Sequence, residues 1–327
     1  MKILVTGGAG YIGSNIVKSL IKSNHDVNVI DNLSSGNIKN LDKKAKFHKI
    51  DLSDFNFLNN FLANNFFDIV IHLSSLIDVK ESYNNPGKYY KVNFISAINL
   101  VSSMVNNKLN KIIFSSSASV YGNLNSKPIK ETDKTSPVSP YGNSKLFIEK
   151  LLKDYGKSHN LKSICLRYFN ACGAQLDGSL GEMHNPETHI IPLLMQVASG
   201  RKKQITIYGN DYKTKDGTAV RDYVHVLDIT SAHIKALKYL MENQKSNIFN
   251  IGNNNGFSVM DLISKTEKIT KKKIKYIKKQ KRDGDVPILI ADNSKIKKIL
   301  KWKTKYSDLN TIIQTAWDWE KKLIKYD

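Results

Sequence analysis

The stretch ILVTGGAGYIG, residues Ile3 to Gly13, decides the fold of this chain. Its apolar start predicts a buried strand, and the residues from Tyr11 onward have the spacing of an amphipathic helix. Gly7 permits a tight turn, Gly10 allows the backbone to approach a pyrophosphate, and Gly13 allows close packing of helix on strand. The N-terminus of the helix would offer amide donors and partial positive charge to the phosphates. The stretch therefore predicts the first strand, loop and helix of a dinucleotide-binding domain.

The remainder of the first half repeats this alternation of strand and helix. Short apolar runs predict further buried strands at Val27–Ile30, Phe47–Ile50, Ile69–Leu73, Ile112–Phe114 and Ile164–Leu166. Amphipathic patterns predict helices at Tyr11–Ser23, Phe55–Asn64, Lys88–Asn107 and Tyr141–His159. This alternation indicates an α/β fold of the Rossmann type, with a doubly wound parallel sheet covered by helices on both faces.

The pattern changes after Asn170. Residues 173–189 are rich in Gly, Asn, His and Pro and are expected to form a loop. Helices are expected near 190–199, 228–243 and 258–270, and short strands at Ile205–Tyr208, Val224–His225 and Ile248–Ile251. We therefore expect a cofactor-binding domain over residues 1–170. Residues 171–327 should form a smaller α/β substrate-binding lobe, with some segments returning to the first domain.

Composition narrows the class of protein. The 327 residues are 41% hydrophobic, as in globular proteins, and no run approaches the length of a membrane span. The first six residues lead directly into the glycine loop, so no signal peptide is expected. The two cysteines, Cys165 and Cys172, suit a reducing cytoplasm and provide neither a disulfide framework nor a CxxC metal site. We predict no metal.

The net charge of +21 has two interpretations. Clustered lysines and arginines would indicate a nucleic-acid binder. Here the lysines are spread along the chain among Asn, Asp and Glu, as AT-rich codon usage would produce. The one dense run, Lys271 to Arg282, alternates with Ile and Tyr like the solvated face of a strand. We favour compositional drift and expect no nucleic-acid partner, although the charge would steer small anions toward the protein.

Two acidic positions follow predicted strands. Asp31 ends the second strand, where its carboxylate would accept hydrogen bonds from the adenosine ribose and repel a 2′-phosphate. This position favours NAD over NADP. Asp51 and Leu52 end the third strand, where the carboxylate could meet the adenine amino group.

Three residues suggest oxidation of an alcohol. Tyr141 and Lys145 are one helical turn apart and share a helix face, and Ser117 follows the strand Ile112–Phe114 at the ligand-binding edge of the sheet. A free phenol has a pKa of about 10, and a neighbouring ammonium, helped by a nicotinamide cation, is expected to lower it. Tyr141 could then remove a hydroxyl proton while hydride leaves the same carbon for NAD.

At this point the chain resembles the extended short-chain dehydrogenase/reductase family, and within it the UDP-glucose (UDP-N-acetylglucosamine) 4-epimerases. The resemblance covers nearly the whole chain and includes motifs outside the cofactor domain. The matching segments are Gly7–Gly13, Asp31–Leu33, Asp51–Leu52, Ser115–Gly122, Tyr141–Lys145, Arg167–Asn170, Tyr208–Tyr212, Asp216–Val226 and Arg282–Pro287.

The resemblance implies a mechanism. Tyr141 takes the proton of the sugar 4-hydroxyl, and C4 gives hydride to tightly held NAD. The 4-keto sugar then rotates about its link to the diphosphate, and hydride returns to the other face of C4. By the same resemblance, Arg221 and Arg282 should clamp the UDP diphosphate and Asp285 should contact the uridine ribose.

The resemblance also implies which residues contact each ligand. NAD would be bound by Gly7, Gly10, Tyr11, Ile12, Gly13, Asp31, Asn32, Asp51, Leu52, Leu73, Ser74, Ser75, Asn93, Tyr141, Lys145 and Tyr168. The UDP-sugar would be bound by Ser117, Tyr141, Asn170, His189, Ile190, Thr206, Tyr208, Arg221, Arg282, Asp285 and Leu289. His189 occupies a position where relatives often have asparagine. A homodimer through helices near 88–107 and 141–158 is also implied.

Three positions refine the resemblance. Sugar 4,6-dehydratases of the family carry an Asp-Glu pair where this chain has Ala118-Ser119, so dehydration is not expected. Ile77 stands where some epimerases place a lysine beside the nicotinamide, and Lys80 is not expected to replace it. Leu289 leaves more room for a 2-acetamido group than a tyrosine would, so N-acetylated UDP-hexoses are expected to be accepted as well.

Other functions remain open from sequence. Another NAD-dependent UDP-sugar enzyme, such as a uronate 4-epimerase or a decarboxylase, would share most of these motifs. A non-catalytic NAD-binding regulator would not need Ser117, Tyr141 and Lys145 together.

Overall fold

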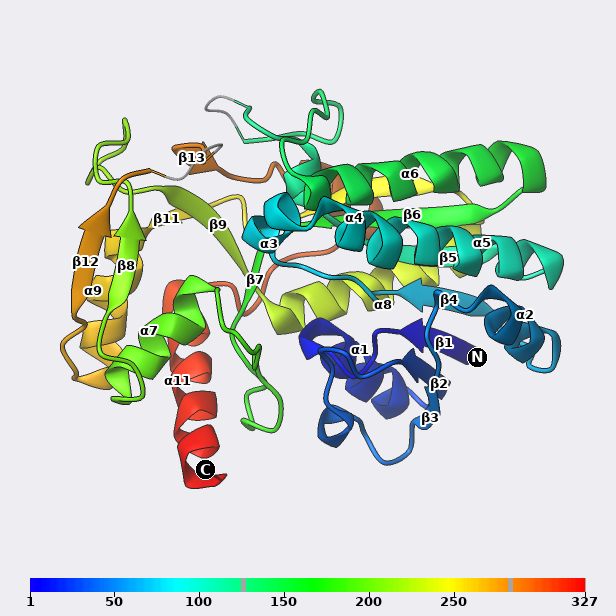
Figure 1. Cartoon of the computed structure of the whole chain (residues 1–327), viewed down its shortest axis with the longest axis horizontal. Helices are drawn as coiled ribbons and strands as arrows, with labels where there is room; N and C mark the ends of the chain where they lie inside the picture. Colours follow the sequence, from blue (N-terminus) through cyan, green and yellow to red (C-terminus); the bar gives the residue numbers. More distant parts are fainter. Residues whose placement is uncertain (125–127, 282–284, 327) are drawn as a thin grey trace. The chain divides into compact units, whose positions relative to one another are not determined.

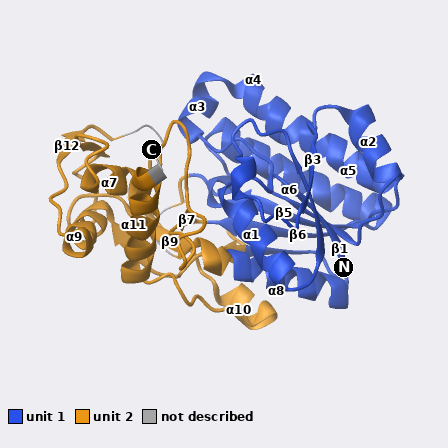
Figure 2. Ribbon diagram, turned by 90° about the horizontal axis from the view of Figure 1, so that it is seen from below, with its two compact units in different colours: residues 1–122, 134–168, 230–249 blue, residues 123–133, 169–229, 250–327 orange. Residues whose placement is uncertain are grey.

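The computed structural model describes residues 1–124, 128–281 and 285–326 (Figure 1). The chain forms two compact units, coloured separately in Figure 2. The first contains residues 1–122, 134–168 and 230–249, and the second contains residues 123–133, 169–229 and 250–327. The chain passes from the first unit to the second next to the expected boundary at residue 170, residues 230–249 lie in the first unit, and residues 123–133 lie in the second.

A seven-stranded sheet forms the centre of the first unit, in the order β10-β6-β5-β4-β1-β2-β3. Ile3, Leu4 and Val5 are fully buried, as expected for a strand covered on both faces. The pairings of β1 with β2 and β4, of β2 with β3, of β4 with β5 and of β5 with β6 are parallel. The strands are β1 (Lys2–Thr6), β2 (Asp26–Asp31), β3 (Lys46–Lys49), β4 (Ile69–His72), β5 (Lys111–Ser117), β6 (Lys162–Tyr168) and β10 (Asn247–Ile251). The predicted Rossmann-type sheet is confirmed.

Helices cover both faces of this sheet (Figures 1 and 2). Apolar residues of α2, α5 and α6 pack with the sheet in one core, which includes Leu58, Met104 and Leu152. The helices of this unit are α1 (Tyr11–Lys22), η1 (Ile38–Asn40), α2 (Phe55–Ala63), α3 (Val79–Asn84), α4 (Pro86–Tyr89), η2 (Tyr90–Ile95), α5 (Ser96–Asn106), η3 (Ala118–Val120), α6 (Pro140–His159) and most of α8 (Val226–Asn243).

The helix expected over Lys88–Asn107 is divided into α4, the π-helical segment η2 and α5. Asn93 in the π-helical segment is 1% exposed, and its side-chain amide pairs with the backbone of Leu76 at 2.8 and 3.1 Å. A π-helical turn changes the direction in which side chains leave the helix, and such turns are frequent at functional sites. The apolar pattern alone does not reveal it.

The second unit contains a small sheet in which β11, β7 and β13 all pair with β9, and a two-stranded sheet of β8 and β12. Residues 123–133 join this unit because Ile129 bonds through its backbone to Ile290 and Asp292, both at 2.8 Å. The elements are β7 (Asn170–Cys172), α7 (Ile190–Ala198), β8 (Ile205–Tyr208), β9 (Val220–His225), β11 (Gly256–Ser258), α9 (Val259–Thr270), β12 (Tyr276–Lys279), β13 (Ile288–Leu289), α10 (Ser294–Leu300) and α11 (Leu309–Tyr326).

Several of these elements escaped prediction because they are short or polar. β12 is exposed at every residue, in agreement with the solvated strand expected within Lys271 to Arg282. Among the residues that the structure describes, no helix is long and apolar enough to cross a membrane.

Candidate active site

The glycine loop lies where the carboxyl ends of β1, β2 and β4 meet. The Gly7 amide donates to the carbonyl of Ile30 at 2.8 Å. Gly7 has a φ of +72°, and a Cβ there would lie 2.5 Å from the backbone nitrogen of Ser74. A Cβ on Gly13 would lie 2.2 Å from the carbonyl oxygen of Gly7. Both positions therefore require glycine for the packing of the chain itself.

Gly10 has different surroundings. A Cβ at this position would meet only the carbonyl oxygen of Gly7, at an ordinary 3.5 Å. Gly10 is also the N-cap of α1 and has no side chain to bond the first-turn amides, which include those of Tyr11 and Ile12. Space at the N-terminus of a helix suits a phosphate group. The fold therefore leaves open the position at which the sequence predicts a pyrophosphate.

Asp31 holds the backbone around this loop. Asp31 is 8% exposed, and its carboxylate accepts hydrogen bonds from the amides of Ala9 at 3.1 Å and Leu33 at 2.8 Å. Each carboxylate oxygen has a second lone pair, so these bonds leave capacity for the predicted ribose contact.

The pair Asn32 and Asp51 lies beside Asp31 in sequence and in space. Asn32 donates to Asp51 at 3.0 Å, and the Ser53 amide donates to the same carboxylate at 2.8 Å. The backbone bond from Ser53 and the bond from Asn32 hold the pKa of Asp51 below its ordinary value. Leu52 is 5% exposed and belongs to the core.

The other predicted cofactor residues lie near the ends of β4 and β6. Leu73, Ser74 and Ser75 directly follow β4. Asn93 donates to the hydroxyl of Ser144 at 3.2 Å in addition to its bonds with Leu76. The Tyr168 hydroxyl lies 2.7 Å from Nε2 of His233. Contacts of these residues with NAD stay predictions.

The structure brings Ser117, Tyr141 and Lys145 together in the first unit. Ser139 caps α6, and its hydroxyl accepts from the Gly142 amide at 3.1 Å, which starts the helix just before Tyr141. Lys145 is 2% exposed, and its Nζ lies 5.7 Å from the centre of the Tyr141 ring. The same Nζ donates to the carbonyl oxygen of Ser115 at 2.8 Å.

Burial has the largest effect on the protonation of this group. Burial raises the pKa of Tyr141, while a hydrogen bond with the side chain of Ser117 acts in the opposite direction. Burial also lowers the pKa of Lys145 to about 7. In the chain by itself burial thus disfavours the charged form of both groups, and the lowering of the tyrosine pKa by a lysine and a nicotinamide cation together stays a prediction.

The Lys145 pKa has a consequence for stability. The folded value of about 7 lies below the ordinary 10.5, so the unfolded chain binds more protons between these values. Stability then rises with pH across this interval, and the full cost of burying the charge, up to about 5 kcal/mol, is present below it. We expect Lys145→Met to raise the melting temperature of the ligand-free chain at about pH 6, and less at about pH 9. Lys150→Met, on the exposed face of α6, is the control. A gain that is equal at both pH values would contradict this assignment.

In the second unit, three of the predicted substrate residues lie together. Arg221 on β9 stands opposite Leu289 on β13 in the parallel register. Its guanidinium forms an ion pair with Asp285 at 3.1 Å. Both charged residues were predicted to hold UDP, and their mutual contact fixes the direction of the arginine. Arg282, predicted to share the diphosphate with Arg221, lies outside the described residues.

The other predicted substrate residues lie on separate elements of the same unit. Asn170 begins β7, and its side chain donates to the carbonyl of Asp222 at 2.8 Å. Thr206 and Tyr208 lie on β8. His189 is the N-cap of α7, and Ile190 is the first residue of that helix.

Comparison with known proteins identifies the family. Residues 4–315 match the sequence model of the GDP-mannose 4,6 dehydratase family. The chain is 46% identical over 319 residues to the UDP-glucose 4-epimerase of Lacticaseibacillus casei, covering 98% of this chain and 96% of that one. The chain belongs to the UDP-glucose 4-epimerase family. The resemblance found in the sequence is thus confirmed.

Solved structures of the family agree with this fold over its whole length. A UDP-glucose 4-epimerase from Stenotrophomonas maltophila, solved with bound NAD and formylated UDP-arabinopyranose, has a TM-score of 0.96 at 34% identity and covers 100% of both chains. The UDP-Glc/GlcNAc 4-epimerase of Campylobacter jejuni has a TM-score of 0.86 at 41% identity, covering 98% of this chain and 99% of that one.

One polar network near the candidate catalytic residues was not predicted. Glu149 lies four residues after Lys145 on α6 and is 6% exposed. Arg167 on β6 donates to both oxygens of this carboxylate, at 2.9 and 2.6 Å, and also to the Tyr121 hydroxyl at 2.8 Å. Ser116 donates to it at 2.5 Å. The sequence held one signal for this network, because Glu149 is a charged residue on the helix face that otherwise packs on the sheet.

A second unpredicted residue is Asp222, which is fully buried in the second unit. Its carboxylate accepts from the backbone amides of Asn253, Asn254 and Ala291 at 2.7, 3.0 and 3.1 Å. Burial raises the pKa of Asp222 to about 7 despite these bonds. Through these bonds Asp222 fixes two chain segments, at residues 253–254 and at residue 291, next to the strand that carries Arg221.

Proposed function

We propose that this chain interconverts the C4 epimers of a UDP-hexose through a transient 4-keto sugar, with NAD as a cofactor that is regenerated in each cycle. UDP-glucose and UDP-galactose are the principal pair. The observation that carries the proposal is the placement of Tyr141 beside buried Lys145 in a chain that matches the epimerases over its full length. Ser117 bonds with the Tyr141 side chain and completes the group.

The residues present fit NAD. A Cβ on Gly10 would enter space that the protein leaves open, and Asp31 lies next to the loop with lone pairs to spare. The glycine loop, Asp31 and the residues after β4 would hold the cofactor. When bound, NAD accepts hydride from the sugar and returns it, and its nicotinamide adds positive charge.

The chain's own residues would manage the proton. Tyr141 would accept the proton of the 4-hydroxyl when the sugar is oxidised and return it when the keto group is reduced. Lys145 would stabilise the phenolate by its charge, and Ser117 would orient the reacting hydroxyls. Arg221 would bind the diphosphate of UDP, a role that suits guanidinium geometry.

Dehydration is the reaction in the name of the matching family model, but this chain is not equipped for it. Elimination across the sugar C5 and C6 needs an additional acid and base. Ala118 and Ser119 stand in η3 where the dehydratases carry an Asp-Glu pair, and the Ser119 amide donates to the Ser117 hydroxyl at 3.1 Å. Neither side chain can serve as that acid and base at neutral pH.

N-acetylated UDP-hexoses are a second proposed pair. Leu289 is half-buried on β13 beside Arg221 and leaves more space than a tyrosine would. The relative from Campylobacter jejuni carries both sugars in its name.

The direct test is incubation of the purified chain with UDP-galactose, UDP-N-acetylgalactosamine, UDP-galacturonate or GDP-mannose, without added NAD. Conversion of UDP-galactose to UDP-glucose is expected, with retained cofactor supplying the activity. Conversion of UDP-galacturonate alone would indicate a uronate epimerase or, with loss of CO₂, a decarboxylase. Absence of UDP-N-acetylgalactosamine turnover would remove the second pair.

The Gly10 position provides a specific prediction. Gly10→Ala adds a methyl group that meets no protein atom closer than 3.5 Å, so the melting temperature of the ligand-free chain should change little. The methyl would enter the proposed phosphate site, and NAD affinity should fall by about tenfold or more, equivalent to about 1.4 kcal/mol. Calorimetric titration with NAD measures this. Gly13→Ala is the contrasting variant, expected to destabilise the chain because its Cβ would lie 2.2 Å from a backbone oxygen. Unchanged NAD affinity in Gly10→Ala would remove the pyrophosphate from this position.

We also propose that the chain is a cytoplasmic homodimer. Both cysteines are buried and unpaired, as in a reducing compartment. Val92 and Ile95 in η2 and Phe147 on α6 expose 37, 47 and 36% of their surface, and they lie in the helical regions through which a dimer was expected. Light scattering of the wild type and of Ile95→Glu tests the assembly, with a dimeric mass expected only for the wild type.

A further inference from the structure

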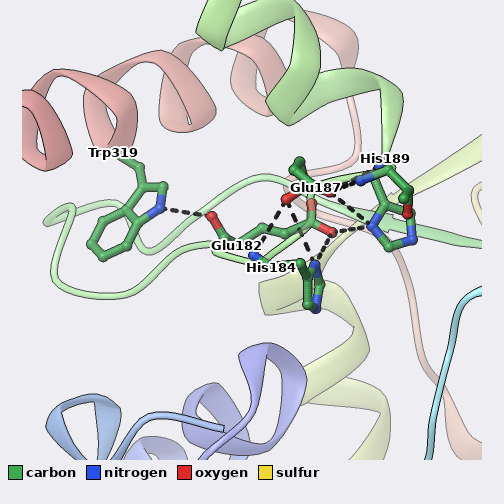
Figure 3. A network of polar contacts seen from close by, with 6 residues as sticks. Glu182, His184, Glu187, His189 and Trp319 are labelled. Carbon is green, nitrogen blue, oxygen red and sulfur yellow. Dashed lines mark hydrogen bonds and ion pairs between the residues drawn. The ribbon is translucent and has the colours of Figure 1, made fainter. Parts of the chain in front are cut away.

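A cluster of two histidines and two glutamates occupies the loop before α7. Glu182, His184, Glu187 and His189 lie within eight positions of sequence, and Figure 3 shows their polar side-chain ends converging on one point. One ligand-type atom from each residue lies within 4.8 Å of all the others. The proposed epimerase reaction uses only His189 from this group. The prediction of no metal rested on the absence of a CxxC motif and did not consider these four residues.

Two of the four nitrogen–oxygen distances within the cluster match those around a small ion. Nδ1 of His184 lies 3.3 Å from Glu182 and 3.7 Å from Glu187. Nδ1 of His189 lies 2.7 Å from Glu182 and 3.3 Å from Glu187. A tetrahedral zinc ion with bonds of about 2.0–2.1 Å separates neighbouring ligand atoms by about 3.3–3.4 Å. Each nitrogen thus has a carboxylate oxygen at nearly the separation that zinc imposes.

The orientation of the His189 ring also suggests a shared centre. Its Nδ1 lies 2.7 Å from a carboxylate oxygen of Glu182 and 3.3 Å from one of Glu187, so this nitrogen faces both carboxylates. A ring nitrogen that faces two carboxylates can bind an ion held between them.

Charge and burial favour a cation in the cluster. The side chains of Glu182 and Glu187 are each 5% exposed, and two buried carboxylates require compensation. Imidazole and carboxylate are both common zinc ligands. Two neutral histidines, two carboxylates and one divalent ion form a neutral set.

The chain holds these ligands in place before any ion binds. The Glu187 carboxylate accepts from the amides of Thr188 and His189, both at 2.8 Å. Trp319 on α11 donates its indole N–H to the Glu182 carbonyl at 2.9 Å (Figure 3). A Cβ on Gly181 would lie 2.4 Å from the Trp319 ring, so the start of the loop packs closely on this side chain.

We propose that Glu182, His184, Glu187 and His189 form a structural zinc site that fixes the loop leading into α7. Four protein ligands complete a tetrahedral shell, which is the pattern of structural rather than catalytic zinc. The ion would hold His189 and Ile190 in place at the start of α7. This proposal is independent of the epimerase reaction, because the metal can be measured without substrate.

The test begins with chain that has been stripped of metal by a chelator and dialysed. Calorimetric titration with ZnCl₂ is expected to show one zinc ion per chain, and Co²⁺ is expected to give the intense visible absorption of a tetrahedral site. Glu187→Gln and His184→Gln each remove one ligand and should weaken zinc affinity by about 100-fold or more, beyond the effect of losing an outer-shell partner. His159→Gln, at the exposed end of α6, is the matched control and should bind as the wild type does.

Two results would overturn the proposal. The first is a wild-type affinity for zinc no greater than that of Glu187→Gln. The second is a weak, octahedral cobalt spectrum. Either would leave a network of protonated histidines and carboxylates in the loop. If the variants do not fold, the stoichiometry and the cobalt spectrum of the wild type decide the question alone.

Discussion

Replacing Tyr141 with phenylalanine is expected to lower kcat for UDP-galactose epimerisation by about 10²–10⁴-fold, the usual contribution of a positioned acid or base. The variant loses the hydroxyl that would carry the proton in both halves of the reaction. It keeps the aromatic ring near Lys145. Fold, NAD binding and UDP binding should therefore be retained, and the loss should appear in kcat rather than in KM.

Tyr155→Phe is the matched control for this variant. Tyr155 lies on the same helix, α6, and its hydroxyl is 2.9 Å from that of Ser102. Its replacement removes the same atom from a site with no proposed part in the chemistry, so kcat should stay near the wild-type value. A Tyr141→Phe enzyme with at least half of the wild-type kcat would show that another group carries the proton.

The pKa values of Tyr141 and Lys145 show why positive charge from the cofactor and the lysine is needed for Tyr141 to act as a base. Burial holds Tyr141 in its neutral form and lowers the pKa of Lys145 to about 7. The sequence could place the two residues on one helix face, because their spacing of four is fixed by helix geometry. It could not show how deeply the amine is buried, because burial depends on packing against β5. The shared helix face of the two residues was therefore predictable from the sequence, and the burial of their side chains was not.

The same distinction applies to the fold. The strands of the large sheet were predictable because a strand covered on both faces is continuously apolar, as Ile3, Leu4 and Val5 are. The π-helical segment around Asn93 and the passage of residues 123–133 into the second unit were not. Both depend on hydrogen bonds to distant backbone, at Leu76 and at Ile290. The cluster in the loop before α7 likewise depends on a bend that brings together residues with no periodic spacing.

Glu149→Met is expected to have the largest effect on stability. Glu149 and Arg167 are 6 and 3% exposed, and their carboxylate and guanidinium meet in two bonds of 2.9 and 2.6 Å. Removal of the carboxylate leaves the arginine charge buried with only the Tyr121 hydroxyl among these partners. The expected loss is about 3–5 kcal/mol in the free energy of unfolding. Urea unfolding followed by circular dichroism measures it, with a midpoint well below that of the wild type.

Two further variants separate the buried charge from the lost contacts. In Glu149→Met/Arg167→Met both charges are absent, and apolar side chains of similar length can pack in their place. We expect this double variant to recover most of the stability, since the cost of an isolated buried charge exceeds the net value of the pair. Glu242→Met breaks the Lys238 ion pair of 3.8 Å, whose side chains are 76 and 59% exposed, and should cost less than about 1 kcal/mol. A double variant as unstable as Glu149→Met would mean that the hydrogen bonds to Ser116 and Tyr121, rather than the charge, hold α6 to the sheet. That outcome would tie the position of Tyr141 and Lys145 to a polar network instead of an ion pair.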